Sequence, residues 1–118
     1  MGNLSTHFSR SEFACKCGCG GNTVDAEMLM LCEDVRRIEK GPVIVSSGFR
    51  CYSHNEQVKG SSNSQHLYGR AADLLVSDPR KIYDTLCCLY PRKYGFGLYS
   101  TFIHVDSRSH VMARWREE

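Results

Sequence analysis

Two histidines and one aspartate stand out because their side chains suit a divalent metal ion. His66 and Asp73 lie seven residues apart in Ser-Gln-His-Leu-Tyr-Gly-Arg-Ala-Ala-Asp, and His104 lies in Phe-Ile-His-Val-Asp. Two imidazoles and one carboxylate leave the fourth position of zinc open, as catalytic zinc requires. Zinc held in this way lowers the pKa of water toward ~7 and supplies a nucleophile at neutral pH. The set therefore predicts a hydrolytic zinc centre.

The spacing of His66 and Asp73 has a geometric rationale. Gly69 lies between them and permits a bend that brings both side chains to one end of a sheet. Spacing alone is weak support, because each ligand taken singly fits a structural role. These roles are a loop histidine, a polar residue at a strand end and a histidine on an exposed strand face.

Periodicity and punctuation predict the elements that position these residues. Apolar residues at helical spacing predict a helix over 26–40 with Asp25 as its cap, and a second helix is expected over 79–89 with Pro79 at its first position. Short apolar runs predict strands at 42–46, 71–76, 95–99, 102–106 and 111–115. The expected fold is α+β, a small antiparallel sheet with helices packed on one face, in a single domain over 1–118.

The strands 95–99 and 102–106 are predicted to form a hairpin. With a two-residue turn, Gly97 lies opposite His104 and Gly95 lies opposite Asp106 on one face of the sheet. Glycine has no side chain, so we expect empty space above these two positions where a metal or ligand fits.

Composition excludes several classes of protein. The 118 residues carry 15 basic and 13 acidic side chains, a net charge of +2 that gives no broad basic face for nucleic acid. Nothing approaches the run of ~18 apolar residues that a membrane span needs, and the start lacks the basic-then-apolar order of a signal peptide. We expect a monomer made in the cytoplasm, without nucleic-acid partners or stable membrane insertion.

The chain resembles a known family of zinc peptidases. The motifs that carry the resemblance are Ser47-Gly48-Phe49-Arg50, Asn55, Gly60, Ser64 to Asp73, Gly95 to Tyr99 and Phe102 to Asp106. In this order they are similar to the motifs of the zinc D-Ala-D-Ala carboxypeptidase family. This family includes VanY-type and VanX-type peptidases and the L-alanyl-D-glutamate endopeptidases of phage endolysins. It is structurally related to the hedgehog signalling domain. The resemblance spans roughly Phe8 to Trp115.

The resemblance implies a hedgehog-like metallopeptidase fold and one Zn²⁺ per chain, held by His66, Asp73 and His104. It implies hydrolysis of a peptide bond in the stem peptides of peptidoglycan, either D-Ala-D-Ala or L-Ala-D-Glu. The Cys-Gly start, Phe13 to Gly20, looks most like phage or prophage versions. This implies cell wall degradation after lysis-type release or as part of a phage particle.

The resemblance also suggests which residues bind substrate. Arg50 matches the arginine that holds substrate, and a guanidinium suits a peptide carboxylate or carbonyl. Ser64 either forms a hydrogen bond in the site or caps its local turn. For Gln65 the choice between a role in the site and a structural role is likewise open. Tyr99 is a candidate donor to a developing oxyanion or a packed aromatic side chain.

The identity of the general base is open. Family members carry an acidic residue three positions before the last zinc histidine, and Thr101 occupies that position here. Asp106 is the nearest acidic candidate, either as the base or as a partner that orients His104. Thr101 also supports an alternative function, a catalytically inactive zinc-containing module that binds peptidoglycan or a protein partner.

Seven cysteines form a separate feature of the sequence. Cys15, Cys17 and Cys19 with Cys51 could form a thiolate zinc site or a disulfide that pins the amino terminus, and free thiols are the plain alternative. Their spacing is not the Cys-x-x-Cys pairing of zinc ribbons, so the sequence assigns no second metal.

Overall fold

The computed structural model describes residues 2–118. Its elements in chain order are η1 (Arg10–Phe13), α1 (Ala26–Glu39), β1 (Ile44–Ser47), α2 (Tyr52–Gln57), η2 (Gln65–Tyr68), β2 (Ala71–Leu75), α3 (Pro79–Leu89), β3 (Gly95–Tyr99), β4 (Phe102–Asp106) and β5 (Ala113–Glu117). The α+β class predicted from the sequence is confirmed, and both long helices lie where the periodicity placed them.

The five strands form one sheet in the order β1-β2-β4-β3-β5. The first four strands pair antiparallel, and the hairpin has the predicted register, Gly95 opposite Asp106 and Gly97 opposite His104. β5 differs from the prediction, because it pairs parallel with β3 and begins two residues later than expected. Both edges of β4 are already taken by β2 and β3. The chain therefore returns past the hairpin and adds β5 to the free edge of β3, in the direction of β3.

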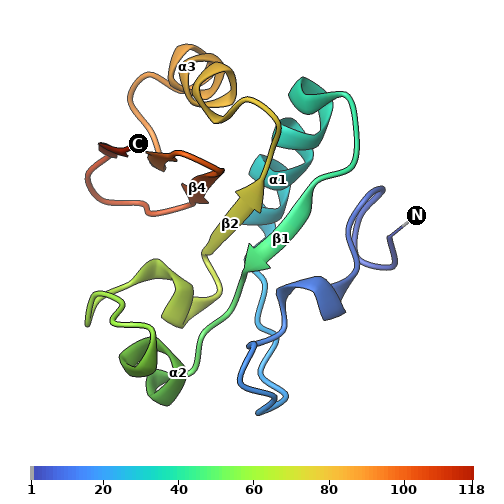
Figure 1. The fold of residues 1–118 in the computed structure, drawn as a ribbon, viewed down its shortest axis with the longest axis vertical. Helices are drawn as coiled ribbons and strands as arrows, with labels where there is room; N and C mark the ends of the chain where they lie inside the picture. Colours follow the sequence, from blue (N-terminus) through green and yellow to red (C-terminus); the bar gives the residue numbers. More distant parts are fainter. Residues whose placement is uncertain (1) are drawn as a thin grey trace.

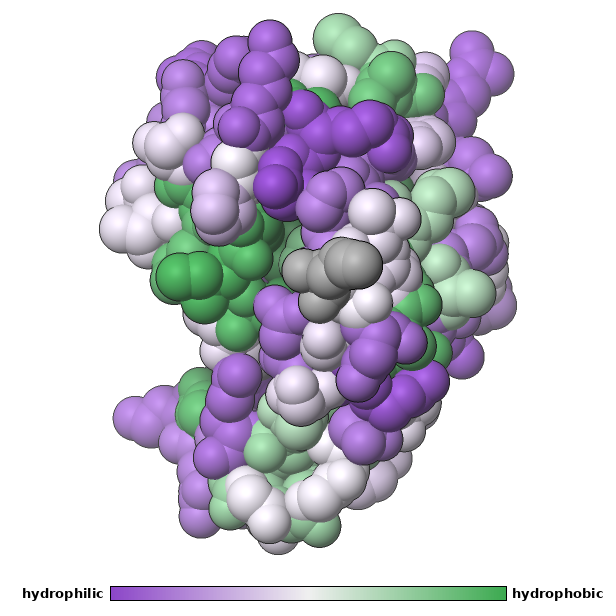
Figure 2. Space-filling model, turned by 90° about the vertical axis from the view of Figure 1, so that its right-hand side faces the viewer, coloured by the Kyte–Doolittle hydropathy of each residue, from purple (hydrophilic) through white to green (hydrophobic). Residues whose placement is uncertain are grey.

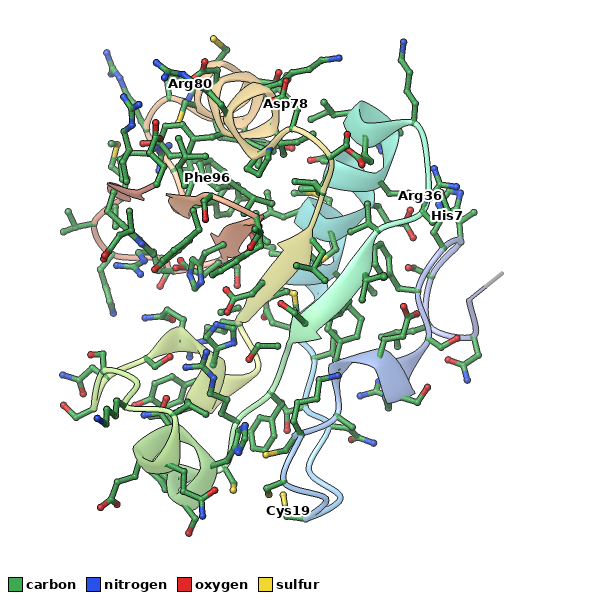
Figure 3. All side chains as sticks on the ribbon, in the orientation of Figure 1. His7, Cys19, Arg36, Asp78, Arg80 and Phe96 are labelled. Atoms are coloured by element: carbon green, nitrogen blue, oxygen red, sulfur yellow. The ribbon has the colours of Figure 1, made fainter. Side chains whose placement is uncertain are left out.

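The two long helices cover one face of the sheet. α1 packs on β2 and β4, and α3 packs on β3 and β4; Figure 1 shows α1 behind β1 and β2. Phe96, labelled beside α3 in Figure 3, is fully buried on this face with Leu74, Ile103 and Val105. Strand alternation then leaves the neighbouring residues of each strand on the opposite, helix-free face.

Local capping fixes where these helices start. The Asp25 carboxylate accepts a hydrogen bond from the Met28 backbone N–H at 3.1 Å, and Asp78 accepts one from Lys81 at 3.2 Å. Each cap is worth about 1 kcal/mol of helix stability. The Asp25 carboxylate also accepts a 2.7 Å bond from the Ser107 hydroxyl, which ties the start of α1 to the chain just after β4.

The long segment between β1 and β2 contains two short helices. α2 overlaps the single helical turn that the sequence indicates at about 55–58, and the 3₁₀-helix η2 was not predicted. Gly69 ends η2 in the left-handed region with φ 68°, a conformation that favours glycine. This bend turns the chain directly from η2 into β2, as the sequence predicted.

The surface around the amino-terminal segment is mostly hydrophilic. Figure 2 shows this side, with a large hydrophobic area at the left of the view and smaller ones elsewhere among hydrophilic side chains. Among residues 2–118, no helix combines the length and the apolar character that crossing a bilayer requires.

Candidate metal centre

His66 lies in η2 with one ring nitrogen fixed and the other without a hydrogen bond. Its backbone N–H donates to the Ser64 hydroxyl at 3.2 Å, so Ser64 caps the turn. Its Nδ1 donates to the Gly48 carbonyl at 2.7 Å, since a carbonyl can only accept. Nε2 is buried and makes no hydrogen bond, although it lies 3.3 Å from Asp73 Oδ1. A buried polar atom left in this way needs a partner.

Asp73 and His104 face each other across β2 and β4, where they are register partners. His104 Nδ1 lies 2.9 Å from Asp73 Oδ1, and its Nε2 lies 2.8 Å from Asp106 Oδ2. The ligand atoms of His66, Asp73 and His104 all lie within 4.8 Å of one another. The structure therefore brings together all three ligands predicted from the sequence.

The residues fit a zinc ion. Two imidazoles and a carboxylate are a common zinc donor set with an open position. The second nitrogen of each imidazole is held by another group, Gly48 for His66 and Asp106 for His104. Such outer partners fix the orientation of metal-binding histidines. The unpartnered Nε2 of His66 is the atom that a metal would satisfy.

The electrostatics of the metal-free centre follow from its close contacts. Burial raises the pKa of the Asp73 carboxyl, but contacts with His104 and His66 outweigh burial and hold that pKa well below its usual range. Burial lowers the pKa of His104, but its bonds to Asp106 and Asp73 outweigh burial and raise the pKa to about 9. His104 is thus protonated at neutral pH before a metal binds, and the metal must displace this proton.

Asp106 lies behind His104, away from the centre. It is fully buried, and Arg108 donates to both of its oxygens at 2.8 Å. Burial raises its pKa, but Arg108 and His104 outweigh burial and hold the pKa below its usual range. A carboxylate enclosed on all sides has no access to substrate. This geometry is that of a partner orienting His104, and it argues against Asp106 as the general base.

A cavity of about 710 Å³ opens beside the three ligands. Its lining residues are Arg50, Val58, Lys59, Gly60, Ser61, Asn63, Ser64, Gln65, His66, Asp73, Tyr99, Phe102, His104, Arg108, Trp115 and Glu117. The four residues predicted to bind substrate are all among them. Its size suits a short peptide, because ligand sites commonly span ~300–1,000 Å³.

Arg50 is held in place by three side chains. Its Nε donates to the Ser47 hydroxyl at 3.1 Å, its Nη1 donates to Asn55 Oδ1 at 3.2 Å, and its Nη2 lies 3.5 Å from Asp73 Oδ2. A guanidinium has five N–H donors. The donors that remain are available to a carbonyl or carboxylate in the cavity that Arg50 lines.

The space predicted above the hairpin glycines is filled. A side-chain carbon on Gly97 would lie 2.4 Å from the Trp115 indole, and one on Gly95 would lie 2.4 Å from the Asp106 oxygens. The expectation of empty space was therefore wrong. Gly97 instead lets Trp115 lie against His104, with ring centroids 4.9 Å apart, and Gly95 leaves room for the Asp106 carboxylate.

Comparison with known proteins agrees with this geometry. Residues 6–106 match the family model described as Peptidase M15. The chain belongs to the peptidase M15 family. The zinc D-Ala-D-Ala carboxypeptidase of Streptomyces albus G is 54% identical to this M15 chain over 33 residues. That match covers 28% of this chain and 13% of the relative, so most of the relative has no counterpart in the alignment.

The M15 centre is arranged in rows across the sheet. Asp73, His104, Gly97 and Trp115 form one row, each residue paired with the next. Tyr99 and Glu117 pair in the adjacent row, where Tyr99 stacks on Phe102 with ring centroids 4.3 Å apart. The Tyr99 hydroxyl accepts a 3.0 Å bond from the Trp115 indole.

Sequence reasoning missed Trp115 and Glu117 as residues of this M15 site. The predicted last strand covered 111–115, which left Glu117 outside it. With the strand at Ala113–Glu117, alternation places Trp115 and Glu117 on the same face. Thr101, at the position where family members carry an acid, lies exposed in the hairpin turn and does not line the cavity.

Proposed function

We propose that this chain is a zinc peptidase that hydrolyses a peptide bond in peptidoglycan stem peptides. The observation that carries the proposal is the convergence of His66, Asp73 and His104 at the wall of the 710 Å³ cavity that Arg50 also lines. Zinc held by these three residues would supply a Lewis acid and activate water at neutral pH. Membership of the M15 family and the named activity of the Streptomyces relative support the same reaction class.

The cavity favours a peptide that carries carboxylates. Arg50, Lys59 and Arg108 all line it. Stem peptides bear free carboxylates, so an arginine with unused donors can hold one and fix the position of the scissile bond. Fixing a substrate in this way accounts for a large part of enzymatic rate enhancement. Tyr99 is placed to donate to the substrate carbonyl while the Trp115 indole orients its hydroxyl.

Glu117 is the group that we assign as general base. Of the acidic residues in the described chain, Asp73 and Glu117 line the cavity, and Asp73 is a metal ligand. Asp106 is enclosed by His104 and Arg108. Glu117 is exposed in the row next to the ligands, so its carboxylate can accept a proton from the attacking water and return it to the leaving amine.

The resemblance to the phage members of this peptidase family supports a phage or prophage setting, in which the enzyme acts during lysis or from a phage particle. The Cys-Gly start is the feature of this chain that supports it.

Mass spectrometry of peptidoglycan fragments tests the function and identifies the bond. We expect zinc-loaded protein to release D-alanine or a peptide cut at L-Ala-D-Glu, and both a chelator and His66→Ala to abolish the product. Zinc-loaded protein that binds the fragments and leaves them uncut would instead establish the inactive binding module, which Thr101 favours.

A further inference from the structure

A second group of potential metal ligands lies outside the cavity. It consists of Cys15, Cys17, Cys19 and Cys51, whose sulfur atoms all lie within 4.8 Å of one another. Three of them come from the amino-terminal loop, and Cys51 precedes α2. Figure 3 shows Cys19 at the end of the molecule where this loop approaches α2. None of the four lines the cavity.

The sulfur separations match a tetrahedral zinc site. Cys15 Sγ lies 3.4 Å from Cys17 Sγ and 3.8 Å from Cys51 Sγ, and the Cys17 and Cys51 sulfurs are 3.6 Å apart. Zinc–sulfur bonds of ~2.3 Å in a tetrahedron place sulfurs about 3.8 Å apart. A disulfide requires ~2.05 Å between two sulfurs and leaves the others aside. Mutual proximity of all four thus favours one shared ion.

Backbone groups around the cluster already point at the sulfurs. The Cys51 N–H donates to Cys15 Sγ at 3.5 Å, the His54 N–H donates to Cys51 Sγ at 3.4 Å, and the Gly21 N–H donates to Cys19 Sγ at 3.4 Å. N–H donors stabilise thiolates, which are the form that binds metal.

We propose that Cys15, Cys17, Cys19 and Cys51 bind a structural zinc ion. Four thiolates complete the coordination shell, so this site holds its metal without an open position for substrate. The proposal is independent of the peptidase function, because the site shares no ligand with the His66 centre.

The position of this site gives it a structural purpose. Cys51 directly follows Arg50 and caps α2, and α2 contains Asn55, whose side chain holds the Arg50 guanidinium. The amino-terminal loop also bonds to this segment through the Phe49 N–H and the Phe13 carbonyl at 2.9 Å. A metal that joins Cys15 to Cys51 therefore clamps the amino-terminal loop onto the segment that presents Arg50.

Cobalt and zinc loading test the proposal. Full-length protein is purified under reducing conditions and loaded with Zn²⁺ for metal analysis or with Co²⁺ for absorption spectroscopy. We expect two zinc ions per chain in the wild type and one in Cys17→Ser, in which an exposed ligand is replaced. The cobalt form should show the sulfur-to-cobalt charge-transfer band of a tetrahedral thiolate site in the wild type, and Cys17→Ser should lose it.

Two controls make the result specific. Cys88→Ser replaces an exposed cysteine on α3 outside the cluster and should keep both zinc ions and the band. His66→Ala should keep the band while losing the other ion, which separates this site from the catalytic one. Absence of the band from intact wild-type protein, or its full retention in Cys17→Ser, would overturn the proposal. The wild-type spectrum decides even if a variant fails to fold.

Discussion

The two ligand clusters of this protein differ in what surrounds them. His66, Asp73 and His104 come from η2, β2 and β4, are all buried, and border a cavity of about 710 Å³. The cysteine cluster comes from loops, its Cys17 and Cys19 are exposed, and it borders no part of that cavity.

The two clusters also differ in the number of ligands and in the hydrogen bonds that hold those ligands. The centre at His66 has three ligands, and its two histidines are held by hydrogen bonds that they donate to the Gly48 carbonyl and the Asp106 carboxylate. The cysteine cluster has four ligands and is supported by backbone N–H groups. Three ligands leave a position for chemistry, whereas four close the shell and stabilise local structure. The comparison teaches that a cavity and an incomplete ligand set, together, distinguish a reactive metal site.

Loss of a metal ligand gives the largest expected effect. His66→Ala should abolish hydrolysis, a loss beyond the ~10–100-fold that removing an outer partner costs. Cys17→Ser should leave the three catalytic ligands in place and keep measurable hydrolysis. Activity and zinc content measured on both variants test the division of roles. Equal loss of hydrolysis in the two, with both folded by circular dichroism, would contradict it.

Removing the proposed base should give the next largest effect. We expect Glu117→Gln to lower kcat by ~10²–10⁴-fold, because proton transfer by a positioned side chain contributes this much. Zinc content should be unchanged, since Glu117 is not a ligand.

Two neighbouring variants serve as controls for the base. Glu118→Gln removes a carboxylate that pairs with Arg116 and does not line the cavity, and Thr101→Ala changes an exposed turn residue. Both should keep wild-type kcat. Wild-type kcat in Glu117→Gln would show that another group moves the proton.

Asp106 tests whether outer support tunes the catalytic centre. Asp106→Asn should weaken zinc binding by ~10–100-fold, because the carboxylate orients His104 and raises its basicity. Competition with a chelator measures the affinity of each zinc ion separately, and the thiolate-bound ion should be unaffected. Unchanged zinc affinity with a lower kcat would instead make Asp106 a participant in proton transfer.

Crowding above the hairpin gives the smallest expected effect. Gly97→Ala places a carbon 2.4 Å from the Trp115 indole. We expect this overpacking to destabilise the fold by ~1–3 kcal/mol and to lower the melting temperature. The cobalt–thiolate band should persist, since the cysteine cluster lies elsewhere. A melting temperature equal to the wild type would show that Trp115 moves aside freely.

Local signals in the sequence predicted most of the elements. The caps Asp25 and Asp78 act within four residues of themselves, and the hairpin register follows from a two-residue turn. By contrast, the parallel pairing of β5 depends on which strand edge is free. The pattern of residues along the chain does not predict this. The error moved the predicted strand by two residues and hid Glu117.

The sequence by itself indicated His66, Asp73 and His104 as candidate metal ligands by residue type and motif. It also predicted the sheet face that carries His104, because alternation along a short strand is a local property. Only the tertiary structure decided what fills the space above the glycines and which acid reaches the cavity. It also decided that Cys51 lies beside Cys15, which is 36 residues earlier in the chain. These contacts depend on how the whole backbone returns on itself, and residue spacing along the chain does not encode that path.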